Sequence, residues 1–231
     1  MSLIVALDFP ELEPCRKLLG ELKDLVKIYK IGTELFTAHG WEAVELVHKA
    51  GAQVFLDLKL HDIPTTVAKT ARVIAKRGVF MFNVHTLGGL QMMREAKQAV
   101  DEECRGKARP LLLGVTILTS HEEKTLESEL GIKRSLKDQV LHLAGLAKEA
   151  GLDGVISSPE ETEFLRRAFG KGFVLVTPGI RLPESDKNDQ KRTLTPQDAL
   201  RRGADYLVVG RPVTGAASPR LAVSQILQSL A

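Results

Sequence analysis

Eight short apolar runs alternate with amphipathic stretches along the whole chain, and no other property of the sequence limits the fold as strongly. Each run is rich in Val, Ile and Leu, and a stretch with helical periodicity follows it. Strands that alternate with helices predict right-handed βαβ units and therefore a parallel sheet. The runs cover residues 3–7, 27–31, 53–59, 81–85, 111–118, 153–157, 173–177 and 205–210.

Nearly all of these runs are apolar along their length, as expected of parallel strands that are buried on both faces. Eight such units within 231 residues predict an α/β fold, a single (β/α)8 TIM barrel, with one domain over residues 1–231. A doubly wound open sheet is the alternative. Four of the expected helices cover about residues 11–25, 64–76, 89–104 and 136–150. A fifth helix ends at residue 50, and the last helix reaches the C-terminus. Two more helices begin at the caps Ser158-Pro159 and Thr195-Pro196.

Two connecting segments, residues 120–135 and 179–194, are long and polar. Long loops in a compact domain usually act as lids or are disordered. Because both would lie at the same end of the barrel, we expect at least one of them to be a lid.

Composition and charge exclude several classes of protein. Hydrophobic residues make up 44% of the chain, which is enough for a full core, and a net charge of +3 does not predict nucleic-acid binding. No apolar run approaches the ~18 residues of a membrane span, and no basic segment of a signal peptide opens the sequence. Cys15 and Cys104 are expected to be reduced thiols. We therefore expect a soluble, cytoplasmic protein without a membrane partner.

Polar residues stand at the carboxyl ends of the apolar runs. In TIM barrels that end carries the active site. Any one of these residues alone could simply be the first residue of a loop. Together they predict a polar site, and they are Asp8, Lys30, Asp57, Lys59, His85, Thr116, Thr177, Gly210 and Arg211.

The third run contains the clearest signal, because Asp57 and Lys59 are two residues apart and so share one face of a strand. Buried charges are costly unless they are paired. Asp62 follows three residues later and Lys30 comes from the neighbouring strand, so the four charges alternate in sign. Such an array keeps a lysine protonated in a dry site, which makes Lys59 a candidate proton donor. A purely structural ion pair is the alternative.

The loops after the seventh and eighth runs predict an anion site. They read Thr-Pro-Gly-Ile-Arg at residues 177–181 and Gly-Arg-Pro at residues 210–212. Glycine lets the backbone approach an anion and arginine supplies a bidentate cation. The corresponding loops of TIM barrels often bind phosphate.

We assign no metal site. His61 and His85 lack Cys or carboxylate partners at the spacing of metal ligands. Asp57 and Asp62 carry suitable oxygen atoms for Mg²⁺, but Lys59 between them competes for their charge.

The segment DLKLHDIPTTV at residues 57–67 closely resembles the signature of the orotidine 5′-phosphate decarboxylase family. The D-x-K-x-x-D element is shared with related sugar-phosphate barrels, whereas the KIG, DIP and PGIR contexts are more specific. The chain length is most similar to that of bacterial members. Further family motifs follow in order over essentially the whole chain: ALDF at 6–9, YKIG at 29–32, LTS at 118–120, TPGIR at 177–181, DQKR at 189–192 and VVGRPV at 208–213.

This resemblance implies a homodimeric barrel that decarboxylates orotidine 5′-monophosphate to UMP without a cofactor. It implies that Lys59 protonates C6 of the pyrimidine once CO₂ departs and that Asp57 lies beside the departing carboxylate. Lys30 would hold Asp57 and a ribose hydroxyl. Asp62 would complete the charge array of the neighbouring subunit, with Thr66 close to it on the ribose.

The resemblance also implies the remaining substrate contacts. Asp8 would bind the ribose and Thr119 the base, although Ser120 fits almost as well. The phosphate would be held by Arg181, Gln190, Gly210 and Arg211.

Two other functions are compatible with such a barrel. One is a Mg²⁺-dependent 3-keto-L-gulonate 6-phosphate decarboxylase or hexulose-phosphate synthase, whose metal site would favour a carboxylate near Lys30. The other is a barrel that binds nucleotides without catalysis. The charge array argues against it, because a binding protein gains nothing from burying four charges.

Overall fold

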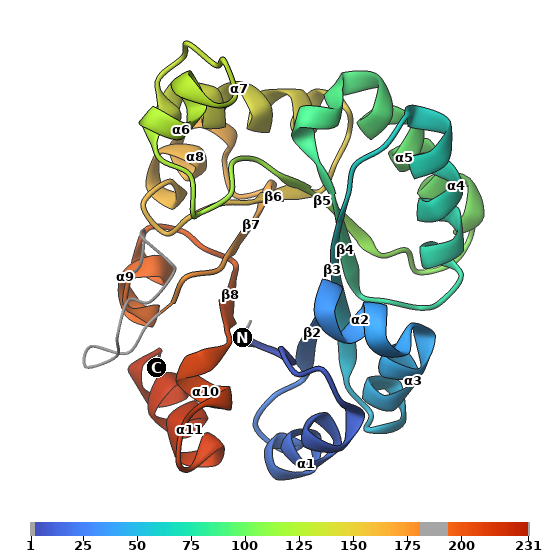
Figure 1. The fold of residues 1–231 in the computed structure, drawn as a ribbon, viewed down its shortest axis with the longest axis vertical. Helices are drawn as coiled ribbons and strands as arrows, with labels where there is room; N and C mark the ends of the chain where they lie inside the picture. Colours follow the sequence, from blue (N-terminus) through green and yellow to red (C-terminus); the bar gives the residue numbers. More distant parts are fainter. Residues whose placement is uncertain (1–2, 181–193, 231) are drawn as a thin grey trace.

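The eight apolar runs form eight parallel strands, and the ring closes because β1 pairs with β8 as well as with β2. The predicted (β/α)8 barrel is therefore confirmed (Figure 1). The structure is a computed structural model that describes residues 3–180 and 194–230. The strands are β1 (Leu3–Ala6), β2 (Ile28–Gly32), β3 (Gln53–Leu60), β4 (Met81–His85), β5 (Leu111–Val115), β6 (Gly154–Ile156), β7 (Val174–Thr177) and β8 (Tyr206–Val209).

Helices surround the ring of strands (Figure 1). Within the described residues they are α1 (Leu12–Leu22), α2 (Thr33–His39), α3 (Trp41–Lys49), α4 (Pro64–Ala75), the 3₁₀ helix η1 (Thr86–Gly88), α5 (Gly89–Glu103), α6 (Glu123–Ser128), α7 (Leu136–Glu149), α8 (Thr162–Phe169), α9 (Pro196–Arg201), α10 (Arg211–Thr214) and α11 (Pro219–Ser229).

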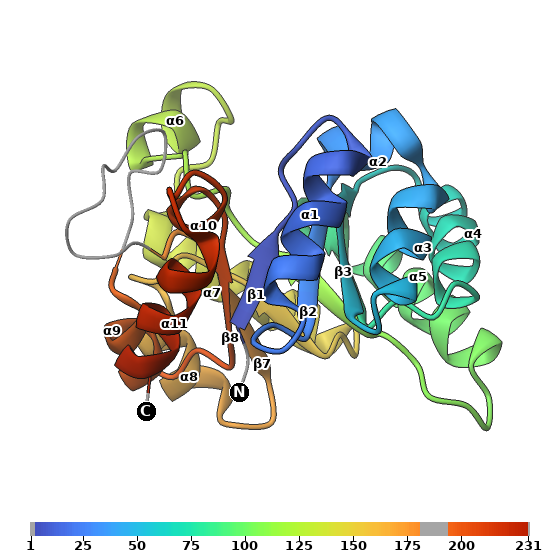
Figure 2. The ribbon, with the colours of Figure 1, turned by 90° about the horizontal axis from the view of Figure 1, so that it is seen from below.

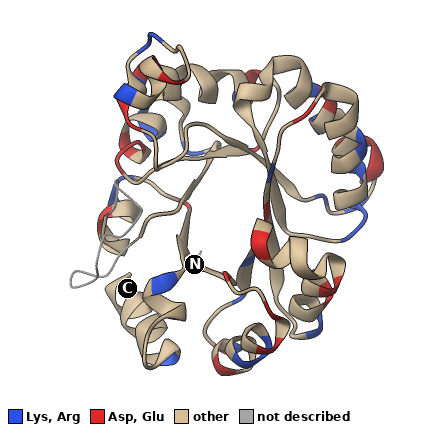
Figure 3. Cartoon of the chain, viewed as in Figure 1, with Lys and Arg blue, Asp and Glu red and all other residues tan. Residues whose placement is uncertain are grey.

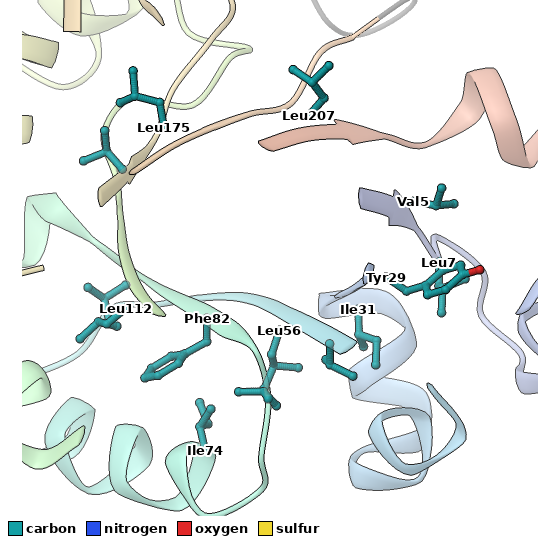
Figure 4. Packing of buried hydrophobic residues seen from close by; sticks show 14 of the residues in the cluster. Val5, Leu7, Tyr29, Ile31, Leu56, Ile74, Phe82, Leu112, Leu175 and Leu207 are labelled. Atoms are coloured by element: carbon teal, nitrogen blue, oxygen red, sulfur yellow. The ribbon is translucent and has the colours of Figure 1, made fainter. Parts of the chain in front are cut away.

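The strands separate two apolar cores, because successive side chains point to opposite faces. Inward-facing residues such as Ile4 and Phe55 fill the barrel. Outward-facing neighbours such as Val5 and Leu56 belong to a larger cluster beneath the helices. Figure 4 shows part of this outer cluster, with Ile74 of α4 facing the strands. Burial on both faces explains why the runs are apolar along their length.

Of the three helix starts predicted at a proline, two are confirmed and one is wrong. Helix α4 begins at Pro64, and α9 begins after Thr195, whose hydroxyl accepts the N–H of Asp198 at 3.2 Å. By contrast, α8 begins at Thr162 rather than at Ser158-Pro159. Ser158 instead opens a turn in which its N–H donates to the carboxylate of Glu161 at 2.8 Å and its carbonyl accepts the N–H of Glu161. The Ser158 side chain is buried and caps no helix.

Two further segments differ from the prediction. The single helix expected up to residue 50 is broken at Gly40, whose backbone (φ +54°, ψ −132°) lies in a region that only glycine adopts readily. The polar segment 120–135 contains the short helix α6, and most of the other long segment, residues 181–193, lies outside the described residues. The prediction of reduced thiols is confirmed, since both cysteines are free and buried.

Because the strands are parallel, their carboxyl ends meet at one end of the barrel. Helices α2, α6 and α10 each follow such a strand end and lie toward the upper end of Figure 2, whereas the N-terminus lies toward the lower end. Charged residues of both signs lie around the ring of helices in Figure 3. None of the helices in residues 3–180 and 194–230 is long and apolar enough to cross a membrane.

Candidate active site

The barrel places charged side chains directly above its apolar interior. Residues two apart share a strand face, so the residue two positions after an inward-facing apolar side chain also points inward, one level closer to the carboxyl end. On three adjacent strands that residue is charged. The three pairs are Ala6 with Asp8, Ile28 with Lys30, and Phe55 with Asp57.

These charges form a continuous array that alternates in sign. Lys30 Nζ lies 2.8 Å from Asp8 Oδ1 and 3.7 Å from Asp57 Oδ2. Lys59 Nζ lies 2.8 Å from Asp57 Oδ1. The side chains of Lys30 and Asp57 are each only 12% exposed, so each depends on oppositely charged neighbours. The array within one chain therefore runs Asp8, Lys30, Asp57, Lys59.

The array keeps its two buried members charged. Burial alone would lower the pKa of Lys30, but Asp57 and Asp8 together raise it above its usual range. Burial would raise the pKa of Asp57, but Lys30 and Lys59 hold it below the ordinary value. The charge of Asp57 stabilises the folded state, and this contribution is lost only as the pH falls through the lowered pKa of Asp57. The contribution of the Lys30 charge is lost only as the pH rises through the raised pKa of Lys30. At neutral pH both groups are ionised.

The array lines a cavity of about 450 Å³ at the carboxyl end of the barrel. This volume lies within the range of small-molecule sites. Apolar side chains of the barrel interior, including Phe55 and Val208, form its floor. The predicted site residues that line it are Asp8, Lys30, Asp57, Lys59, Thr119, Gly210 and Arg211.

Other predicted site residues lie elsewhere. Asp62 and Thr66 are exposed and do not line the cavity of their own chain, and Asp62 Oδ1 accepts the N–H of Ile63 at 2.6 Å. Ser120 is exposed and outside the cavity lining, so of the two candidates for the base it is Thr119 that lines the cavity. Two predicted phosphate ligands, Arg181 and Gln190, lie outside the described residues.

One wall of the cavity combines a cation with residues that have no side chain. Gly210 directly follows β8, and Arg211 opens α10 after it. A Cβ at Gly210 would lie 3.2 Å from Asp8 Oδ2, so a side chain there would crowd the charge array. Gly179, with φ +81°, follows β7 in the same wall. A guanidinium beside main chain that no side chain covers is an arrangement suited to phosphate.

The histidines flank the array from β4 and the loop after β3. The rings of His61 and His85 are 5.5 Å apart. Burial, His61 and Lys59 lower the pKa of His85 to about 4, so its ring is neutral at pH 7. No cluster of three or more His, Cys, Asp or Glu side chains within residues 3–180 and 194–230 has the geometry of a metal site.

The sequence reasoning missed two buried polar residues near the array. Asn83 of β4 is 1% exposed, donates to Asp57 Oδ1 at 2.6 Å and accepts the N–H of Lys59 at 2.7 Å. Ser157, directly after β6, is also 1% exposed and lines the cavity. The signal for Asn83 was present, since it lies two residues after the inward-facing Met81 in an otherwise apolar run.

Sequence comparison relates the chain to known proteins along nearly its whole length. It matches the family described as orotidine 5′-phosphate decarboxylase / HUMPS over residues 1–226. It is 48% identical over 229 residues to the orotidine 5′-phosphate decarboxylase of Legionella pneumophila (strain Paris), covering 99% of each chain. It is also 48% identical over 227 residues to the enzyme of that name from Moorella thermoacetica, covering 97% of this chain and 90% of the relative.

Solved structures agree with these relatives. The crystal structure of orotidine 5′-phosphate decarboxylase from Lactobacillus acidophilus has a TM-score of 0.87 and 39% identity, and the match covers 99% of this chain and 98% of that one. An uncharacterized conserved protein from Geobacillus kaustophilus has a TM-score of 0.88 and 37% identity, with 99% and 100% covered. By its sequence and by its fold, the chain belongs to the orotidine 5′-phosphate decarboxylase / HUMPS family.

Proposed function

We propose that this chain is a carboxy-lyase that converts orotidine 5′-monophosphate to UMP, the last step of de novo UMP synthesis, without a cofactor. The observation that carries the proposal is the alternating array of Asp8, Lys30, Asp57 and Lys59 along one cavity. The names of the bacterial relatives support the same activity.

The chemistry explains why such an array is useful. Loss of CO₂ from C6 leaves a carbanion in the plane of the ring, with no adjacent π system to accept the electrons. A fixed ammonium group directed at C6 stabilises that charge without having to reorganise during the reaction. Lys59 would supply this charge and then protonate C6, and Asp57 would lie beside the departing carboxylate. Lys30 would hold Asp57 in place and bind a ribose hydroxyl.

The remaining contacts are those that the family resemblance implies. Arg211 and Gly210 would bind the phosphate, with Arg181 and Gln190 completing the site. Asp8 would contact the ribose, and Thr119 the base. The phosphate would thereby fix the pyrimidine over Lys59.

The proposed enzyme is a homodimer in which each subunit contributes Asp62 and Thr66 to its partner's site. Both residues are exposed and lie outside the cavity of their own chain. Ile63 between them is 66% exposed, so a large apolar side chain is available there for contact with a partner subunit.

The decisive test of the proposal is conversion of orotidine 5′-monophosphate by the purified protein, followed as the loss of ultraviolet absorbance. Lys59→Ala should lower kcat/KM by more than about 10³-fold, since both the stabilising charge and the proton are lost. Lys59→Arg should be almost as inactive, because a guanidinium does not readily give up a proton. Lys17→Ala, which removes an exposed lysine of α1, should be unaffected. A wild-type protein that leaves the substrate unchanged would refute the proposal.

The Mg²⁺-dependent alternative predicts a different response to chelators. In this chain the ammonium of Lys30 lies between Asp8 and Asp57, so a cation already occupies the position where that alternative needs a carboxylate. We expect decarboxylation to be unchanged within about twofold by EDTA or by added Mg²⁺, since the array is already neutralised by lysines. Activity that EDTA abolishes and Mg²⁺ restores would favour the alternative.

A further inference from the structure

Strand β3 is irregular at the position of the proposed proton donor. Its pairing with β4 shifts register between Leu56 and Leu60. Within this irregularity Lys59 has φ +53°, and among the described residues it is the one non-glycine residue with positive φ. Residues with a Cβ avoid this region because the Cβ crowds the backbone. Some surrounding contact must therefore hold Lys59 in this conformation.

The side chain of Asn83 makes that contact. Its Oδ1 accepts the backbone N–H of Lys59 at 2.7 Å, and its Nδ2 donates to Asp57 Oδ1 at 2.6 Å. Asp57 Oδ1 also accepts a hydrogen bond from Lys59 Nζ at 2.8 Å. The amide of Asn83 thus bonds at once to the backbone of Lys59 and to the carboxylate that holds the Lys59 ammonium.

These two bonds require both an acceptor and a donor on one short side chain. A leucine of similar size would leave the N–H of Lys59 without its acceptor and would remove one of the two hydrogen bonds that Asp57 Oδ1 accepts. An aspartate would satisfy Lys59 but place a second carboxylate against Asp57. At 1% exposure, little water is available at Asn83 to replace the lost bonds.

We infer that Asn83 is a positioning residue for the decarboxylation, which holds the strained backbone of Lys59 and the carboxylate of Asp57 so that the Lys59 ammonium is directed at C6. This inference rests on the proposed function. Asn83 touches neither the substrate nor the reacting atoms in this scheme. Its effect passes through Lys59 and Asp57.

Kinetics of two variants test the inference. Asn83→Leu should lower kcat by at least about 100-fold, the size of effect that a shift of 1 Å in a catalytic group can produce, while KM changes less than about threefold. Asn83→Asp should be impaired at pH 8, where two carboxylates face each other. Its kcat relative to wild type should rise at least about tenfold toward pH 5.5, as a shared proton restores a donor to Asp57.

Thr86→Val is the matched control. Thr86 is also buried near the end of β4, and its hydroxyl donates to the carbonyl of Val115 at 2.8 Å, but it contacts neither Asp57 nor Lys59. This variant loses a buried hydrogen bond and should keep kcat within about threefold of wild type. Equal losses of kcat in Thr86→Val and Asn83→Leu, or a pH profile of Asn83→Asp parallel to wild type, would overturn the inference.

A crystal structure of a variant separates this inference from the proposed function. In the structure of Asn83→Leu we expect Lys59 to return to negative φ and its Nζ to move away from Asp57. If the leucine variant does not fold, the structure of Asn83→Asp at pH 8 tests the same expectation. Unchanged φ and an unchanged Nζ–Oδ1 distance would overturn the role of Asn83 whatever the enzyme's substrate is. A wild-type protein inactive on orotidine 5′-monophosphate would instead refute the proposed function alone.

Discussion

His85 lies beside the charge array, and its environment favours the neutral ring. The pKa of His85 is lowered to about 4, first by burial and then by the charges of His61 and Lys59. Its Nδ1 is buried and has no hydrogen-bond partner within the described residues. In the unfolded chain the ring titrates near its ordinary pKa of about 6.5. Between these values the unfolded state binds the proton, so acid destabilises the native state.

We expect His85→Phe to remove this contribution. Relative to the variant, wild type should lose about 1–2 kcal/mol of unfolding free energy as the pH falls from about 6.5 to about 4; the figure is discounted because the ring is only partly buried. Urea unfolding of both proteins from pH 4 to 8 measures the difference. A difference that does not change with pH would show that His85 does not titrate in this way.

The limits of prediction at this scale are seen at Lys59 and Asn83. The D-x-K-x-x-D spacing was sufficient to predict that Asp57 and Lys59 meet, and they do at 2.8 Å. The positive φ of Lys59 was not predictable, because no local pattern reveals that its N–H donates to a side chain 24 positions away. Asn83 was overlooked because its one signal, the position two residues after the inward-facing Met81, does not reveal that its partners are Asp57 and Lys59.

At the scale of elements, Gly40 divides one predicted helix into α2 and α3. The apolar pattern of both segments is helical, so periodicity alone predicted one continuous helix. The break comes from the backbone of Gly40 (φ +54°, ψ −132°), whose N–H donates to the carbonyl of Phe36 and so ends α2. The helix pattern was therefore predictable, whereas its interruption was not.

Two alanine substitutions test this interpretation. Gly40→Ala should destabilise the protein by about 1–3 kcal/mol, since a Cβ is strained in that conformation. Gly20→Ala in the exposed part of α1 should stabilise it by about 0.5–1 kcal/mol, because Gly20 has helical backbone and nothing within 4 Å of an added Cβ. Thermal unfolding of the two variants measures whether each substitution lowers or raises the stability. A Gly40→Ala variant as stable as wild type would contradict the strain at Gly40.

At the scale of the whole molecule, the sequence was sufficient for the barrel but not for the location of every site residue. Eight apolar runs predicted eight strands because the interior and the helix layer each require an apolar face, and both faces are filled. Asp62 shows the limit. Its spacing from Lys59 suggested one local array, whereas within the chain Asp8 is the fourth member and Asp62 is exposed.

Mixed dimers test the proposed exchange of Asp62. Homodimers of Lys59→Ala and of Asp62→Ala should both be inactive. After dissociation and mixing, about half of the dimers are hybrids, and each hybrid has one site with an intact Lys59 and an intact partner Asp62. Activity should recover to roughly a quarter of wild type if the sites act independently. No recovery, with hybrids confirmed by native mass spectrometry, would show that Asp62 serves its own subunit.

The barrel has no free edge because Leu3, at the start of the chain, pairs with Leu207 of the last strand. During synthesis, β1 leaves the ribosome first. The residues of β8 follow roughly 10–40 s later at ordinary rates of translation, and until then β1 has no β8 to pair with. Throughout that interval the nascent sheet has two open edges whose N–H and C=O groups can pair with another chain. A nascent chain stalled before β8 therefore keeps both edges open and is expected to associate with other chains more readily than the closed barrel does.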